Sequence, residues 1–194
     1  DRGMRWLKTI GAHLPLLALV GCLPGSGDQG LAVDPPSPAV GVGEQLVLTA
    51  EPLEDLSQEP EWEVEEVYGG GFLNSKGFRV TYVAPLGAGL YHLVLRAGRA
   101  DGSPLKVVQE IRVMPIPQME PSEGKVAPGG TRTFTVRMKG LAKDDATWSV
   151  EEPDGGSVSG GGVYRAPAKP GTYHVRATSV LDPGAAAVAV VKVE

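Results

Sequence analysis

The chain of 194 residues contains 27 glycines and 17 prolines, a content that excludes long helices and suits short strands joined by turns. Its formal net charge of −5, without any cluster of lysine and arginine, argues against nucleic acid as a partner. A single cysteine excludes an intramolecular disulfide, and with 3 histidines the chain lacks the ligands for a cysteine–histidine zinc cage. We therefore predict an all-β protein.

The first residues carry the pattern of a signal peptide, which we place at residues 4–21 with Met4 as the start. Arg5 and Lys8 supply its positive charge, and residues 10–20 form a short, mostly apolar run. A membrane-spanning helix needs roughly 20 apolar residues, and this run is much shorter. A transmembrane anchor is therefore not expected.

The apolar run ends in Leu19-Val20-Gly21-Cys22, which resembles the lipobox of bacterial lipoproteins at all four positions. The resemblance implies acylation of Cys22, cleavage after Gly21 and attachment to a membrane through the lipid. By analogy with the bacterial sorting rule, Leu23 in place of aspartate favours the outer membrane. The alternative is a plain secretory signal with an incidental cysteine. Residues 22–30 are rich in glycine and polar side chains and predict a flexible tether.

Most of the remaining chain occurs twice. Trp62 and Trp148 are 86 positions apart, whereas Tyr91 and Tyr173 are 82 positions apart. Register holds on both sides of one gap of four residues, which we place in the glycine-rich runs 69–71 and 160–162. A repeat that keeps register in this way indicates two copies of one domain.

We predict that the first domain covers residues 31–113 and the second residues 118–194. The connection 114–117 contains two prolines and no glycine, so we expect it to be short and semi-rigid. The alternative is a hinge without a fixed angle. Within each domain the apolar residues alternate with polar ones, which predicts strands at 45–50, 62–67, 78–83, 91–96 and 107–113, and at 131–138, 147–151, 163–165, 173–178 and 186–193.

Short strands separated by turn signals are typical of an immunoglobulin-like sandwich. In that fold Trp62 and Trp148 would fill the core between the sheets. Tyr91 and Tyr173 would form tyrosine corners, in which the hydroxyl bonds to the backbone upstream. Two apolar pairs would take the place of the disulfide that joins the sheets in antibody domains, namely Leu48 with Leu93 and Phe134 with Val175.

Several motifs resemble the bacterial Ig-like domains of surface and adhesin proteins, group 2 type. In the second copy they are Val126-Ala127-Pro128-Gly129-Gly130-Thr131, Trp148-Ser149-Val150, Gly162-Val163-Tyr164-Arg165-Ala166-Pro167, Gly171-Thr172-Tyr173 and Ala177-Thr178-Ser179. The first copy departs from them at Glu44 and Val83. The resemblance implies extracytoplasmic, non-catalytic modules for spacing, adhesion or protein contact.

Few residues suggest chemistry. His92 and His174 occupy equivalent positions, and strand alternation points both outward in separate domains, so no shared metal or catalytic site is expected. The acidic run Glu61, Glu63, Glu65 and Glu66 would attract calcium or simply form a solvated face, and we favour the second. Residues 185–191 are small, apolar and β-prone, and would form either a core strand or, less favoured, an edge that pairs with a partner strand.

The sequence therefore predicts a lipid-anchored, non-catalytic protein of the cell envelope, without a cofactor, a metal or a nucleic acid partner. Its Ig-like domains would act as a spacer or scaffold with a protein-binding surface, or as a subunit of an envelope assembly. The alternative is a surface adhesin that binds a glycan or another cell. A small hydrolase or enzyme accessory ranks last, because no nucleophile, base and oxyanion donor converge in the sequence.

Overall fold

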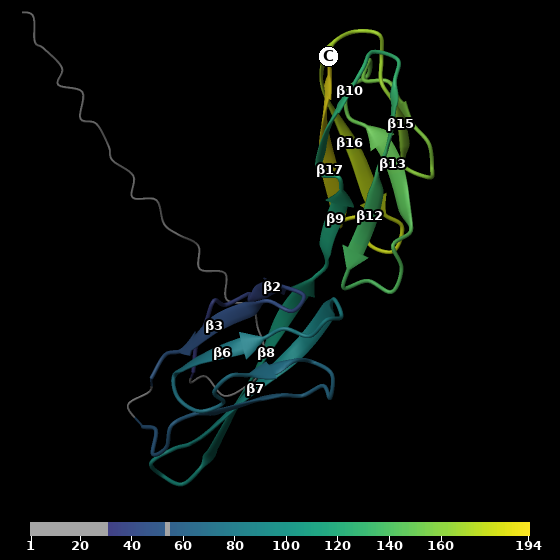
Figure 1. Cartoon of the computed structure of the whole chain (residues 1–194). Coiled ribbons are helices and arrows are strands. Elements are labelled where there is room, and N and C mark those ends of the chain that lie inside the picture. The colour runs from purple at the N-terminus through teal and green to yellow at the C-terminus, as the bar shows by residue number, and fades with distance from the viewer. Residues whose placement is uncertain (1–30, 53–54) are drawn as a thin grey trace, which may run out of the picture.

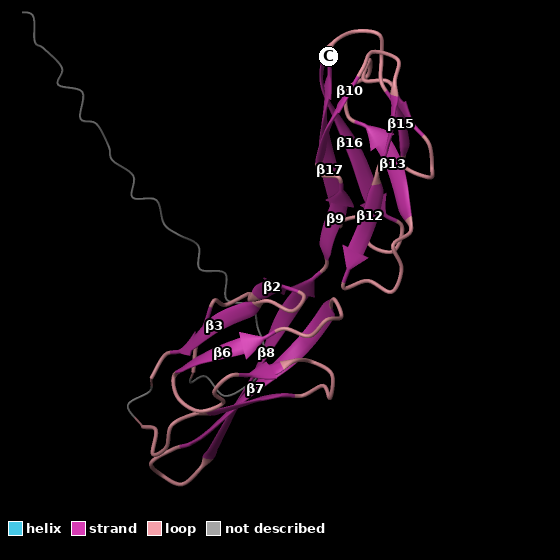
Figure 2. Ribbon diagram, viewed as in Figure 1, coloured by secondary structure: helices cyan, strands magenta, loops and turns pink. Residues whose placement is uncertain are grey.

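The computed structural model describes residues 31–52 and 55–194, and in these residues it contains strands and no helix (Figures 1 and 2). No described segment is a helix of the length and apolar character needed to cross a membrane. The predicted signal peptide 4–21, Cys22 and the tether 22–30 lie outside the described residues. The prediction of an all-β chain with two tandem immunoglobulin-like sandwiches is confirmed.

The first sandwich packs two four-stranded sheets in the strand order of an immunoglobulin domain. One sheet has the order β1 (Val33–Asp34), β3 (Gln45–Ala50), β6 (Arg79–Val83) and β5 (Gly71–Phe72). The other has the order β2 (Ala39–Gly41), β8 (Pro104–Met114), β7 (Gly89–Gly98) and β4 (Glu61–Val64).

The second sandwich repeats this plan (Figure 1). Its four-stranded sheet has the order β10 (Glu123–Val126), β17 (Ala186–Val193), β16 (Gly171–Ser179) and β13 (Ala146–Val150). The opposite face is divided into β11 (Thr131–Thr133), β15 (Val163–Arg165) and β14 (Ser157–Val158), and a pair formed by β12 (Thr135–Lys139) and β9 (Ile116–Glu120). The single strand predicted at 131–138 is thus interrupted at Phe134, whose N–H donates instead to the Gly162 carbonyl.

Each sandwich begins with a strand that changes sheets, a feature that the sequence analysis missed. β1 pairs antiparallel with β3, and after the cis peptide Asp34–Pro35 the chain continues as β2, parallel to β8. β9 pairs with β12, and after the cis peptide Glu120–Pro121 the chain continues as β10, parallel to β17. The repeat therefore includes the first strands of both copies.

The two tryptophans differ in burial. Trp62 is 2% exposed and its indole N–H donates to the Gly77 carbonyl at 3.0 Å. Trp148 is only half-buried at the edge of the second core, so its predicted role of filling the space between the sheets needs correction. Phe72 explains the difference, because its ring lies 6.0 Å from that of Trp62. Its equivalent in the second sandwich is the smaller Val158.

The four-residue gap lies slightly later than predicted. Gly69 and Gly155 are equivalent, because a Cβ at either would lie 2.5 Å from a valine methyl on the preceding strand. The extra residues of the first copy therefore fall between Phe72 and Tyr82, not in the run 69–71. The longer loop of the first copy covers Trp62, and its shorter counterpart in the second copy leaves Trp148 half-buried.

Two tyrosines that the sequence analysis did not single out lie at the centre of each core. Tyr82 and Tyr164 are 0% exposed, and their hydroxyls donate to the carbonyls of Gly69 and Gly155. The predicted apolar pairs surround them: Leu48 and Leu93 are 0% exposed, and so is Val175, while Phe134 is 1% exposed. Burial raises the pKa of both tyrosines, so the hydroxyls stay protonated as donors.

The connection between the sandwiches is shorter than the predicted linker 114–117. β8 ends at Met114 and β9 begins at Ile116, which leaves Pro115 as the residue outside strands. Ile116 packs against the first core, and the Ala88 N–H donates to the Gly140 carbonyl across the junction at 2.9 Å. The sandwiches therefore lie end to end with direct contacts between them (Figure 1).

The unequal burial of the tryptophans predicts unequal losses of stability. Trp62→Ala should lower the free energy of unfolding of the first sandwich by about 3–5 kcal/mol, because it empties a filled core site. Trp148→Ala should lower that of the second sandwich by a smaller amount, about 1–3 kcal/mol. Amide hydrogen exchange in β7 and β16 reports the two sandwiches separately, and equal losses would contradict the assignment.

Candidate functional site

The predicted site residues fall into two groups. Cys22, with cleavage after Gly21, lies outside the described residues and stays a prediction. Tyr91 and Tyr173 are the third residues of β7 and β16. Each hydroxyl donates to a carbonyl four residues upstream, at Gly87 and Lys169, at 3.0 Å. These two tyrosines have the geometry of tyrosine corners and fix the loop before each strand.

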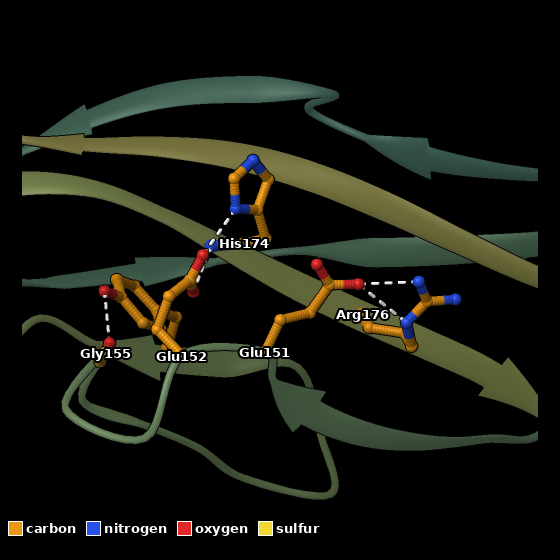
Figure 3. Close-up of polar contacts among 6 residues, drawn as sticks. Glu151, Glu152, Gly155, His174 and Arg176 are labelled. Atoms are coloured by element: carbon orange, nitrogen blue, oxygen red, sulfur yellow. Dashed lines mark hydrogen bonds and ion pairs between the residues drawn. The ribbon is translucent and has the colours of Figure 1, made fainter. Parts of the chain in front are cut away.

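A glutamate in each sandwich holds the histidine that follows the corner tyrosine. Glu66 accepts hydrogen bonds from the backbone N–H of His92 at 2.9 Å and contacts its ring Nδ1 at 2.7 Å. Glu152 does the same for His174, at 2.8 Å and 2.5 Å (Figure 3). The histidines thus point outward, as strand alternation predicts. Their hydrogen bonds connect β7 to the residues that follow β4, and β16 to the residues that follow β13.

Partial desolvation of Glu66 would by itself raise the pKa of this carboxyl, but the hydrogen bonds from His92 outweigh it and the pKa lies below its ordinary value. Partial desolvation would likewise raise the pKa of Glu152, but the hydrogen bonds from His174 outweigh it and the pKa lies below its ordinary value. The hydrogen bond to Glu66 raises the pKa of His92. The pair of Glu66 and His92 is therefore an ion pair at mildly acidic pH.

Most of the acidic run of the first sandwich is paired with cations. Glu61 lies 3.6 Å from Lys76, Glu63 lies 2.7 Å from Arg96, and Glu66 binds His92. The pairs with Lys76 and Arg96 are exposed and contribute little to stability. In residues 31–52 and 55–194 no three histidine, cysteine or acidic side chains gather in a group that could hold a metal ion.

The second sandwich has an arginine–glutamate pair beside its histidine. Glu151 Oε1 accepts from Arg176 Nε at 2.8 Å and lies 2.6 Å from Nη2 (Figure 3). The equivalent of Arg176 in the first sandwich is Val94, so the two copies use different charges on the same sheet face. The histidine clamp is shared, whereas this ion pair distinguishes the copies.

An apolar groove of about 620 Å³ lies where the sandwiches meet. We call it the junction groove, and its apolar lining includes Leu90, Met114, Pro115, Leu141, Leu181 and Ala185. Leu90, Met114 and Leu181 are 49%, 44% and 53% exposed. Arg112 and Asp182 lie at the same groove and supply one charge of each sign. The lining of the groove comes from both sandwiches, so the groove needs both of them.

The strand predicted from residues 185–191 borders this groove. β17 lies inside its sheet between β16 and β10, which agrees with the favoured prediction of a core strand. However, β10 pairs only with Val190–Val193, so the first half of β17 has a strand neighbour on one side alone. A second hollow beside Ala186–Val188, next to β9, continues the groove along this open half-edge.

No protein-family model matches the sequence, and no curated protein does either. Solved structures with a similar fold include the fibronectin(III)-like modules of CbhA from Clostridium thermocellum, 15% identical over 84% of this chain and 92% of that chain, with a TM-score of 0.35. Another is a fragment of intimin in complex with the translocated intimin receptor, 15% identical over 87% of this chain and 64% of that chain, with a TM-score of 0.44. A third is invasin, a bacterial integrin-binding protein, 12% identical over 84% of this chain and 38% of that chain, with a TM-score of 0.39. The chain thus spans less than two thirds of the intimin and invasin structures, and the likeness concerns the fold alone.

Sequence reasoning missed the histidine clamps and the junction groove for different reasons. Glu66 and His92 recur as Glu152 and His174 at the repeat offsets, so the clamp had a signal in the sequence. The groove had none, because Leu90, Met114 and Leu181 come from separate segments that only the folded junction brings together.

The histidine clamp predicts the pH dependence of the first sandwich. The raised pKa of His92 contributes stability that is present below its ordinary pKa of 6.5 and is lost as pH rises through the folded value. The lowered pKa of Glu66 contributes stability that is present above its ordinary pKa of 4.5 and is lost as pH falls through the folded value. The contribution should therefore be full between these pH values and decline on both sides.

Urea unfolding across pH 5 to 9 measures this effect. In Glu66→Gln the loss of stability above pH 6.5 should become shallower than in the unmodified chain, because the ion pair no longer forms. Glu59→Gln changes an exposed carboxylate of the same sandwich. It should leave the slope of the free energy of unfolding against pH unchanged. An unchanged slope in Glu66→Gln would show that the clamp does not couple to folding.

Proposed function

We propose that this chain is a lipid-anchored protein of the cell envelope whose two Ig-like sandwiches form a spacer and offer a protein-binding surface at their junction. The junction groove carries the proposal. Leu90, Met114 and Leu181 keep about half of their surface in water, beside an open half-edge of β17. Clustered exposed apolar side chains with a polar rim are typical of protein contact sites.

The contacts across the junction support the spacer role. Pro115 is the one residue between β8 and β9, and the Ala88 to Gly140 hydrogen bond adds a second tie beside it. At Gly140 a Cβ would lie 2.6 Å from a Val42 methyl, so the loops of the two sandwiches are in close contact. A short proline-containing connection with such contacts favours a fixed relative geometry over a hinge.

The lipid anchor is proposed from the lipobox, which ends in Cys22, and Leu23 favours the outer membrane. The alternative role is a surface adhesin for a glycan. Glycan sites commonly use exposed aromatic side chains. Among the described residues Tyr68 is such a side chain, at 88% exposure. We rank a protein partner first because the apolar groove is larger than this single ring.

The anchor predicts that Cys22→Ser releases the protein from membranes. Without the thiol no diacylglyceryl group is attached, and the apolar signal segment alone is too short to span the bilayer. Fractionation of cells that express the unmodified chain or the variant checks this. If the variant still sediments fully with membranes and resists extraction with carbonate, acylation is not what holds the protein there.

The junction groove predicts that Leu90→Asp and Leu181→Asp abolish association with the partner. Each places a charge into the apolar surface, and burial of an unpaired charge strongly disfavours binding. Chemical cross-linking in intact cells, followed by mass spectrometry, identifies the partner of the unmodified chain. Val47→Asp is the matched control, because Val47 is 41% exposed on β3, away from the groove. A partner retained by both groove variants, or lost with the control alone, would refute the assignment.

A further inference from the structure

One arginine of the second sandwich has a buried nitrogen without a hydrogen-bond partner among the described residues. Arg132, in β11, has its Nε buried, and this atom makes no hydrogen bond to any described residue. Its side chain lies against Gly124 of β10, where a Cβ would come within 2.6 Å of Nε. The glycine therefore leaves the space in which the guanidinium lies, between the two sheets at their open edge.

The first sandwich shows that this arginine is not required by the fold. Arg132 pairs with Tyr164 in the same register as Leu46 pairs with Tyr82, so Leu46 is the equivalent residue. Leu46 packs against the first core, as an apolar side chain does at that place. A buried donor of a charged group without an acceptor is unfavourable. The second sandwich thus keeps a buried donor at a place where the first sandwich has an apolar side chain.

A hollow of about 410 Å³ lies beside this arginine, and we call it the Arg132 pocket. Lys125, Lys192 and Glu123 line it, together with Gly124 and Val190. Lys125 is paired with Glu194 at 2.5 Å, whereas no described carboxylate forms an ion pair with Lys192 or Arg132. Three cationic side chains therefore meet two carboxylates, which leaves the pocket with a positive charge.

We propose that the Arg132 pocket binds an oxyanion, a phosphate or carboxylate group carried by a small molecule or a lipid headgroup. Arg132 would donate from its terminal nitrogens, which suit the paired oxygens of both groups. Lys192 adds a second positive charge at the mouth. The volume exceeds that of a bare ion, so the pocket also has room for part of the molecule that carries it. The site goes beyond the proposed function and does not depend on it.

The test is a titration of the full chain, followed by amide chemical shifts in NMR spectra. Sodium phosphate and sodium acetate serve as probes, each against sodium chloride at equal ionic strength. Saturable shifts are expected at Gly124, Arg132 and Lys192 with at least one oxyanion and not with chloride. Absence of saturation with both oxyanions in the unmodified chain would overturn the proposal.

Variants separate the pocket from general charge. Arg132→Leu introduces the residue that the first sandwich has at this place, so it should fold, with a Tm equal to or above that of the unmodified chain. It should bind the oxyanion at least tenfold more weakly. Lys192→Gln alters an exposed side chain and should weaken binding several-fold without changing the fold. Arg137→Leu removes a cation from β12, outside the pocket, and should bind as the unmodified chain does. Unchanged binding in Arg132→Leu would refute the site.

Vesicles distinguish the two sources of a phosphate. Co-sedimentation is compared between vesicles of phosphatidylglycerol and of phosphatidylcholine, for the unmodified chain, Arg132→Leu and Arg137→Leu. A difference between the two arginine variants on phosphatidylglycerol alone indicates a headgroup, and saturable shifts without that difference indicate a soluble ligand. If neither the vesicles nor the free oxyanions distinguish Arg132→Leu from Arg137→Leu, the proposal fails.

Discussion

The structure depends on a buried tyrosine in each sandwich whose hydroxyl is satisfied by a backbone carbonyl. Tyr82 and Tyr164 fill the space between sheets that no disulfide joins, and their hydroxyls bond to Gly69 and Gly155. An unsatisfied hydroxyl in such a core would be unfavourable by about 1–3 kcal/mol. The hydrogen bond therefore permits a large ring to occupy the centre, and it also fixes the turn that follows the tryptophan strand.

The sequence was sufficient for those features that depend on alternation and on the repeat. The β3 strand at 45–50 and the β17 strand at 186–193 follow from apolar periodicity, and the corner tyrosines Tyr91 and Tyr173 follow from their equivalent places in the repeat. The half-burial of Trp148 could not be read in this way. It depends on a neighbour, Val158 in place of Phe72, and on the length of a loop, and neither alters the local pattern around the tryptophan.

The candidate surfaces were beyond sequence reasoning because they form between segments. The junction groove joins side chains from β7, β8 and the loop before β17. The burial of Arg132 Nε depends on its contact with Gly124, which belongs to a different strand, so the sequence around Arg132 does not predict it. The histidine clamps are intermediate, since their partners recur in both copies but lie 26 and 22 residues apart. The two copies thus share the buried tyrosines of their cores and differ in the charged side chains on their surfaces.

The sheet-changing first strands determine how the protein responds to mechanical load. β2 runs parallel to β8, and β10 runs parallel to β17, so the second part of the sheet-changing first strand lies beside the last strand in each sandwich. A pull on the two ends of a sandwich slides these strands past each other, so their hydrogen bonds are loaded in shear and must break together. An antiparallel pair pulled from adjacent ends would instead open one bond at a time. The terminal strands of both sandwiches therefore have the geometry that resists a pull along the chain.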